Sequence, residues 1–265
     1  MKRIELLLLS MLMVLLVGCE STIDVESEQP SGVVSEAPAP TQTPPVEVID
    51  FIFTDSHEKL MKDFLSGCKY MIFSQTMSNG IEGQSVYSTT RYTLSVNVEQ
   101  KVQSQTMRYL VVNGISHEGV GYSLYSDGDY TIVNEDGVWV EASDMYKMQV
   151  WDLSSFDNDL DVYMYLLHDL KLPVGVVGTA AGEWWTFEWT EPATDSLVVG
   201  LNYDQLLDAT YKYTFRNKSG TVLPDSVSVR VGYIVEDVQY YMESVVQISS
   251  IGNTSIVMPK VGEKA

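Results

Sequence analysis

Residues 226–235 read SVSVRVGYIV, and this stretch indicates the fold of the chain more clearly than any other. Valine and tyrosine side chains at positions 227, 229, 231, 233 and 235 alternate with small or polar residues at 226, 228, 230 and 232. Because successive side chains of a β-strand point to opposite faces, the stretch has one apolar and one mostly polar face. An antiparallel sheet that is covered on one side needs strands of this kind.

The same period of two occurs elsewhere in the chain, within Tyr92–Val98, Val120–Leu124 and Trp185–Trp189. Dipeptides that end in glycine stand between strand-like runs: Asn79-Gly80, Asn113-Gly114, Asp127-Gly128, Asp136-Gly137 and Ser219-Gly220. Such pairs readily adopt the positive φ angles of tight hairpin turns. We therefore expect hairpin to follow hairpin in one long antiparallel sheet.

A few helices are expected beside the sheet. Asp55 or Ser56 can cap a first helix, whose apolar stripe is Leu60, Met61, Phe64 and Leu65 and which ends at Gly67. A second helix is expected over Asn158–Leu170, because apolar residues recur there at helical spacing and Pro173 prevents its continuation. Residues 203–209 fit a short third helix or a strand.

The N-terminus predicts the cellular address. Lys2 and Arg3 precede an apolar run, Leu6–Val17, which is too short to span a bilayer and indicates a signal peptide over residues 1–18. Leu16-Val17-Gly18-Cys19 resembles the lipobox of bacterial lipoproteins, in which the cysteine is acylated with palmitate or a similar chain. We expect an extracytoplasmic protein that Cys19 anchors to the bacterial cell membrane; the alternative is a signal peptide without lipidation.

Composition then divides the remaining chain. Residues 19–50 hold five of the nine prolines, no aromatic residue and no Lys or Arg, which predicts a disordered tether. Residues 51–265 are long enough for a single β-rich domain, expected to be monomeric. The net charge of −20 excludes binding to nucleic-acid phosphates and disfavours an anionic bilayer surface, so acyl chains must supply the membrane attachment. The acidic surface serves solubility or attracts cations or a basic partner.

The order of these features is similar to that of LolA/LppX-like bacterial lipoproteins. A lipobox, a proline-rich tether, an opening helix and successive hairpins come first, with Gly137-Val138-Trp139 closing a short strand. A mid-chain helix and further strands follow, ending in residues 251–259, IGNTSIVMP. The resemblance implies an α+β fold: a strongly curved, mostly antiparallel sheet, or incomplete barrel, whose concave face is covered by a few helices around an apolar cavity. It also implies carriage of lipids or lipidated proteins, but no ligand-contact residue can be carried over.

Catalytic and metal sites are not expected. His57, His117 and His168 are isolated from one another, and neither G-x-S-x-G nor H-E-x-x-H occurs. The alternating carboxylates of residues 157–161 are similar to a Ca²⁺ loop, but Val162 and His168 stand where such a loop requires Gly and Glu. Acidic residues in the first turn of a helix explain them more simply. We therefore expect no enzyme activity, metal or cofactor, and interpret Cys68 as a buried thiol, with a reactive thiol as the alternative.

Aromatic residues provide the remaining functional signal. Period two places Trp185, Phe187 and Trp189 on one face and Trp184 on the other, where it could contact a partner or a sugar. The three-aromatic face is either plain core or the lining of a ligand cavity. The candidate ligand-binding residues are Trp185, Phe187, Trp189, Tyr122, Val229, Val231 and Tyr233. The expected partner is a lipid or other hydrophobic molecule held in the concavity; the alternative is a non-catalytic cell-envelope interaction module with a packed core.

Overall fold

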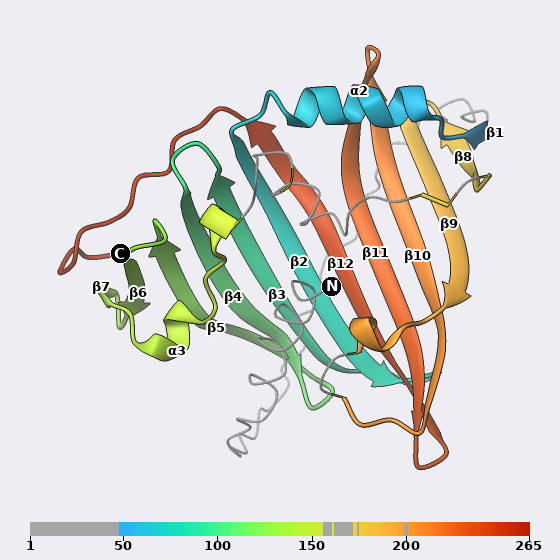
Figure 1. Ribbon diagram of the computed structural model, residues 1–265. Helices are drawn as coiled ribbons and strands as arrows, with labels where there is room; N and C mark the ends of the chain where they lie inside the picture. Colours follow the sequence, from blue (N-terminus) through green and yellow to red (C-terminus); the bar gives the residue numbers. More distant parts are fainter. Residues whose placement is uncertain (1–47, 156–160, 162–171, 174, 199–200) are drawn as a thin grey trace, which may run out of the picture.

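A computed structural model of the chain describes residues 48–155, 161, 172–173, 175–198 and 201–265 (Figure 1). Twelve strands in this part form one sheet in the order β1-β8-β9-β10-β11-β12-β2-β3-β4-β5-β6-β7. Their bounds are β1 Val48–Ile52, β2 Tyr70–Ile81, β3 Val86–Asn97, β4 Val102–Val112, β5 Ile115–Ser126, β6 Thr131–Glu135, β7 Val138–Glu141, β8 Val177–Ala181, β9 Trp184–Pro192, β10 Gln205–Lys218, β11 Thr221–Val235 and β12 Val238–Gly252. The helices are α2 Asp55–Leu65 and α3 Asp144–Lys147, with 3₁₀ turns at Leu153–Ser155 and Asp195–Leu197.

The sheet curves strongly without closing, so the expected incomplete barrel is confirmed (Figure 1). Every neighbouring pair of strands is antiparallel. One meander runs from β2 to β7 and another from β8 to β12, and the two join where β12 pairs with β2. β1, which begins at Val48 and thus ahead of the expected start at Phe51, pairs with β8. No helix among the described residues has the length and hydrophobicity needed to cross a bilayer.

The hairpin turns confirm most of the glycine signals. Asn113-Gly114, Asp136-Gly137 and Ser219-Gly220 have positive φ at both residues, from 51° to 84°, and each joins two paired strands. These are the angles that a type I′ turn requires. At the loop after β5, Gly128 alone has a positive φ, 92°.

The prediction of a turn at Asn79-Gly80 is wrong. Both residues lie inside β2, and the chain turns two residues beyond its end, at Gly83, with a φ of 74°. Gly80 is instead a place of close approach: a Cβ atom there would lie 3.0 Å from the ring of Tyr241, its register partner on β12. The glycine therefore makes room for an aromatic side chain on the convex face, which no local pattern reveals.

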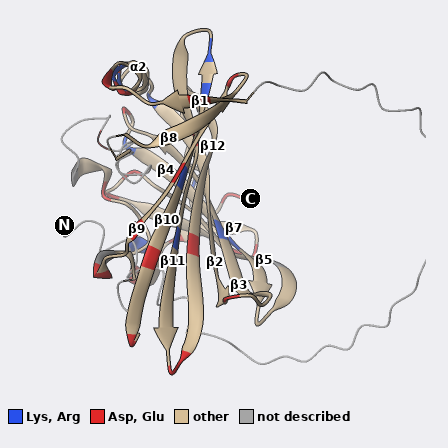
Figure 2. Cartoon of the chain, turned by 90° about the vertical axis from the view of Figure 1, so that its right-hand side faces the viewer, with Lys and Arg blue, Asp and Glu red and all other residues tan. Residues whose placement is uncertain are grey.

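The first helix is confirmed as α2, although Thr54 rather than Asp55 or Ser56 is its N-cap. The Thr54 N–H donates a hydrogen bond of 3.1 Å to Nδ1 of His57. Met61 and Leu65 are buried against the sheet, and Figure 2 shows α2 on one side of the sheet at one end. Residues 205–209 of the ambiguous segment belong to strand β10, whereas the helix expected over Asn158–Leu170 lies outside the described residues apart from Asp161.

The core lies on the concave side of the sheet. A main core cluster includes Met61 and Leu65 of α2, Phe187 of β9 and Leu124 of β5. Cys68 belongs to it; its thiol donates a hydrogen bond of 3.2 Å to the Phe64 carbonyl, and burial raises the pKa of the thiol. The expectation of a buried thiol is thus confirmed. A smaller cluster around Val198, Ala209, Val229 and Val231 fills the other end of β10 and β11.

Candidate ligand-binding face

The strand register aligns side chains in rows across the concave face. One row crosses eight strands, and we call it the buried row because every member is buried: Phe187, Tyr213, Val227, Val246, Gln75, Tyr92, Met107 and Tyr122. It lies beside the side chains that α2 and the segment around Trp151 cover. The centre of the concave face is therefore packed as a protein interior.

The adjacent row, two residues farther from α2 on each strand, is different. We call it the open row: Trp189, Tyr211, Val229, Ser244, Met77, Thr90 and Tyr109. All of its members except Val229 are only half-buried. The apolar face thus continues past the packed centre into a region where large side chains keep part of their surface in contact with solvent.

The seven residues predicted to bind a ligand share the concave face without forming one cluster. Trp185 and Phe187 are in the main core cluster, where the Trp185 ring lies 4.2 Å from that of Phe51. Val229 and Val231 are in the smaller cluster. Tyr233, half-buried near the open end, stacks on Tyr240 at 5.7 Å.

The remaining two, Trp189 and Tyr122, lie at opposite sides of the face, on β9 and β5. Trp189 stacks on Tyr211 with ring centroids 5.1 Å apart and planes at 7°. The Trp189 Nε1 atom is buried, and none of the described residues provides it with a hydrogen-bond partner. Trp184 points to the other, convex face, as its position in the strand predicts, and is 42% exposed with Arg216 5.1 Å above its ring.

Sequence reasoning missed three buried glutamines on this face. The Gln103 amide donates a bond of 2.6 Å to the Trp151 carbonyl and accepts one of 3.2 Å from its N–H, which fixes that segment over β4. The Gln75 amide donates to the Ser244 hydroxyl at 3.0 Å. Gln103 and Gln105 precede Met107 at alternate positions, so strand parity could have placed them inward, but polar residues of both parities in that stretch hide the signal.

Gln105 is the centre of a polar group at the β3–β5 side of the concave face. Its Nε2 donates a hydrogen bond of 2.6 Å to the Tyr122 hydroxyl, whereas its Oε1, equally buried, has no partner among the described residues. The Tyr122 ring meets that of Tyr146, from α3, edge-on at 5.7 Å. Leu94 and Leu124 flank Gln105 in the strand register, so the amide stands between apolar side chains.

Burial keeps the tyrosines of this region in the neutral form. It raises the pKa of Tyr92 to about 12, with a smaller contribution from Tyr109. It also raises the pKa of Tyr122, to which the phenols of Tyr92, Tyr109 and Tyr146 add in that order. The pKa values of Tyr92, Tyr109 and Tyr122 are thus all raised, mainly by burial, and these three phenols stay neutral at neutral pH.

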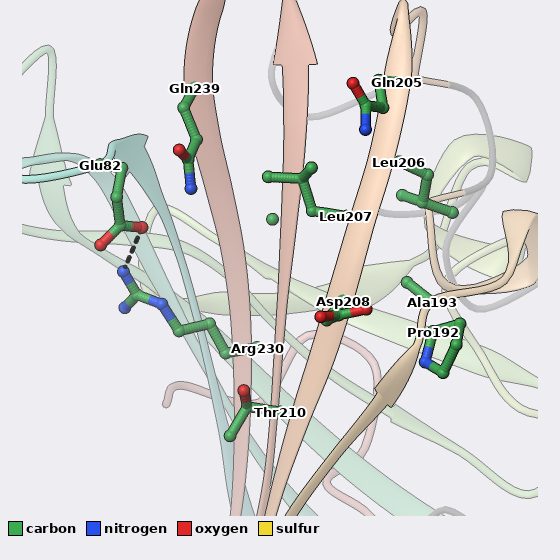
Figure 3. A pocket seen from close by; sticks show the side chains of 11 residues that line it. Glu82, Pro192, Ala193, Gln205, Leu206, Leu207, Asp208, Thr210, Arg230 and Gln239 are labelled. Carbon is green, nitrogen blue, oxygen red and sulfur yellow. Dashed lines mark hydrogen bonds and ion pairs between the residues drawn. The ribbon is translucent and has the colours of Figure 1, made fainter.

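A separate pocket of about 550 Å³ lies around the β10 bulge between Leu206 and Ala209 (Figure 3). Its lining includes Arg230, whose guanidinium binds Glu82 at 2.8 Å and lies 3.8 Å above the Tyr241 ring. Leu207 packs over Gly232, where a Cβ atom would come within 3.2 Å of it. Arg230 and Thr210 have the opposite parity to the open row, which places this part of the pocket on the convex side, and the lining mixes polar and apolar residues.

No protein-family model matches the sequence, and no curated protein matches it. Among solved structures, the lipoprotein LppX of Mycobacterium tuberculosis is similar at a TM-score of 0.40 and 10% identity, over 77% of this chain and 97% of LppX. LprF of Mycobacterium bovis has the same TM-score at 7% identity, over 79% of this chain and 99% of LprF.

A LolA superfamily protein of Nitrosomonas europaea is similar at a TM-score of 0.32 and 10% identity, over 78% of this chain and 96% of its own. Both the LppX and the LolA types are among the neighbours. These are the groups that the order of elements in the sequence resembles. At this level of similarity we transfer neither a ligand nor the role of any residue.

Proposed function

We propose that this chain is an extracytoplasmic lipoprotein, anchored through acyl chains on Cys19, that binds a lipid or another hydrophobic molecule in the concavity of its sheet. The open row is the observation that supports this proposal. Trp189, Tyr211 and Met77 are large apolar side chains that stay half-exposed on a concave surface, whereas residues of the same parity in the buried row are packed. A concave apolar surface of this kind suits a hydrophobic ligand.

The expected gain in free energy comes from covering that surface. Each methylene group that a ligand buries against it contributes roughly 0.8 kcal/mol. An acyl chain that follows the open row from Trp189 towards Met77 would bury many of them and would need little polar recognition. The stacked Trp189 and Tyr211 rings provide a rigid surface at one end of this path.

We propose a non-catalytic role. His57 accepts a hydrogen bond from the Thr54 N–H at the N-terminus of α2, and its ring lies 5.1 Å from those of Phe51 and Trp185. His117 is on an exposed part of β5, towards the opposite end of that strand from Tyr122. His168 lies outside the described residues. The hydroxyl that His57 contacts, that of Thr54 at 2.9 Å, is exposed at the start of α2 and does not lie in an apolar cleft.

The ligand test uses the Cys19→Ser protein recovered from the soluble exported fraction. Organic extraction followed by mass spectrometry should release lipid that copurifies with it, and a fluorescent fatty acid should bind with an increase in emission. If no lipid is recovered and the fluorescent fatty acid does not bind, the ligand proposal is wrong. If the Ser variant remains with the membrane, the acyl anchor on Cys19 is wrong.

A second candidate, a non-catalytic cell-envelope interaction module, is favoured by the sheet edge. β1 pairs only with β8 among the described strands, and its Val48, Ile49 and Ile52 side chains are exposed. An edge strand with exposed apolar side chains can accept a strand from a partner. Crosslinking at Ile49 in cells, together with failure of the lipid assays, would favour this candidate over the carrier.

A further inference from the structure

Gln105 places a polar amide among apolar side chains on the concave face. The residue is 6% exposed, and its Oε1 lies buried on the concave face without a hydrogen-bond partner in the described part of the chain. A buried amide atom without a partner lowers the stability of the fold, because it has lost its hydrogen bonds to water. If packing alone mattered, a leucine at position 105 would give a more stable fold than this glutamine.

Rotating the amide does not remove the problem. With its oxygen and nitrogen exchanged, Oε1 would accept from the Tyr122 hydroxyl, and Nε2 would then be the atom without a partner. The missing partner is consequently either a donor or an acceptor, depending on the orientation of the amide. A hydroxyl group satisfies both cases, because it donates one hydrogen bond and accepts others.

The surroundings select a neutral partner. Leu94 and Leu124 flank the amide in the register, and burial keeps the phenols of Tyr92 and Tyr122 protonated. A carboxylate or phosphate at this position would be desolvated, which is costly, and none of the described contacts of Gln105 and Tyr122 comes from a cation. A hydroxyl group loses much less hydration free energy on leaving water, and hydrogen bonds to the amide and the phenols compensate for that loss.

We propose that Gln105 and Tyr122 form a polar subsite for a hydroxyl group carried partway along a hydrophobic ligand. This inference rests on the proposed function, since it takes the concavity as the ligand site. The apolar part of the ligand lies along the open row and, with α3 displaced, crosses the buried row at Met107 and Tyr122. Its hydroxyl then binds the Gln105 atom that has no partner among the described residues. The preferred substrate class is therefore a hydroxylated lipid rather than a plain hydrocarbon chain.

Access to the subsite passes the short helix α3. Its Tyr146 packs edge-on against Tyr122, while the helix contains only four residues, none of them buried. Little apolar contact therefore resists its displacement. The adjacent Trp151 segment is held more firmly, by the two hydrogen bonds to Gln103. We accordingly place the point of entry at α3.

The test compares stearic acid with positional isomers of hydroxystearic acid, each displacing a fluorescent fatty acid from the soluble Cys19→Ser protein. At least one isomer should bind about tenfold more tightly than stearic acid, because it satisfies the amide. Gln105→Met, which keeps the volume and removes the amide, should lose this preference and keep its affinity for stearic acid. Tyr122→Phe should reduce the preference.

The matched control is Thr106→Val, which removes a hydroxyl from the neighbouring residue, where it contacts Ser123 at 3.1 Å on the convex face. It should retain the full preference. If Gln105→Met fails to fold, Tyr122→Phe, the smaller change, decides the outcome. Equal affinity for stearic acid and every isomer, or a preference that survives both variants, would overturn this inference alone. Failure of all these probes to bind would overturn it together with the ligand proposal.

Discussion

The two sides of the concave face are built by the same strand register but differ in chemistry. At the β9–β11 side, Phe187, Tyr213 and Trp189 form an aromatic surface. At the β3–β5 side, the buried row continues with Tyr92, Met107 and Tyr122, and the Gln105 amide lies between two leucines in the next row towards α2. Each side holds one buried polar atom for which the described residues provide no partner: Nε1 of the stacked Trp189 ring and Oε1 of Gln105. We expect apolar contact to dominate ligand binding at the aromatic side and a specific polar group to bind at the other.

This difference separates affinity from selectivity. Apolar burial is nondirectional and grows with the area covered, so the aromatic side should determine how tightly a ligand binds. A buried hydrogen bond depends on the position of its partner, so the polar side should determine which ligand binds. Variants on the two sides should therefore change different measured quantities.

The largest effect is expected from Phe187→Ala on the aromatic side. Phe187 is fully buried, with edge-on contacts to Phe215 at 5.9 Å and Phe53 at 5.7 Å, and its loss leaves a cavity. The free energy of unfolding should fall by about 3–5 kcal/mol in urea denaturation. The control is Glu188→Ala, next along β9, whose exposed ion pair with Lys212 at 3.8 Å should contribute less than about 1 kcal/mol. Equal effects of the two variants would contradict the packing described for this side.

The second largest effect is expected at alkaline pH, which should lower the free energy of unfolding through Tyr92 on the polar side. Tyr92 has a pKa of about 12 in the folded chain against 10.0 for an exposed tyrosine, so its contribution to stability is complete below about pH 10 and is lost as the pH rises towards about 12. The loss is on the order of 2 kcal/mol, since its side chain is well buried. Tyr92→Phe should remove this part of the pH dependence. Chemical denaturation of both proteins between pH 8 and 12 measures it, and parallel curves would contradict the burial of this phenol.

Several features of the two sides could be predicted from particular stretches of sequence. The alternation in residues 226–235 predicts β11, and the parity of Trp185 and Phe187 predicts their shared buried face. The ambiguity at residues 203–209 arises because a short apolar run fits both periods. Residues 205–209 form a strand because β11 pairs with Gln205, Leu206 and Ala209, and β9 pairs with the segment from Asp208 onward.

Other features depend on contacts between distant residues. Asn79-Gly80 has the local composition of a turn, but the Tyr241 ring that requires Gly80 comes from a strand more than a hundred residues later. Gln105 stands in a stretch with polar residues at both parities, and only its pairing with Leu94 and Leu124 shows that it points inward. Trp185, Phe187 and Trp189 on the aromatic side and Tyr122 on the polar side were therefore predicted as candidates from the sequence, whereas Gln105 required the structure.

Ligand affinity should decrease moderately in Trp189→Ala. Trp189 is half-buried and stacks on Tyr211, so its removal takes away part of the proposed ligand surface while leaving the buried row in place. The dissociation constant of a fluorescent fatty acid should rise about tenfold, with little change in discrimination between stearic acid and its hydroxylated isomers. Trp184→Ala, which removes the neighbouring indole from the convex face, is the control and should bind normally. If only Trp184→Ala lost affinity, the ligand would lie on the convex face, which would contradict the proposal.

The smallest effect on stability is expected where the effect on selectivity is greatest, in the double variant Gln105→Met/Tyr122→Phe. Removing both groups eliminates the one hydrogen bond between them, of 2.6 Å, together with the amide atom that has no partner. Replacing a partly satisfied buried polar pair by apolar groups of similar volume is close to neutral, so the free energy of unfolding should change by less than about 1 kcal/mol in either direction. Phe187→Ala, equally buried, provides the contrast in the same urea titration. A large loss of stability in the double variant would mean that the amide serves the fold, and the polar side would then be as much a part of the core as the aromatic side is.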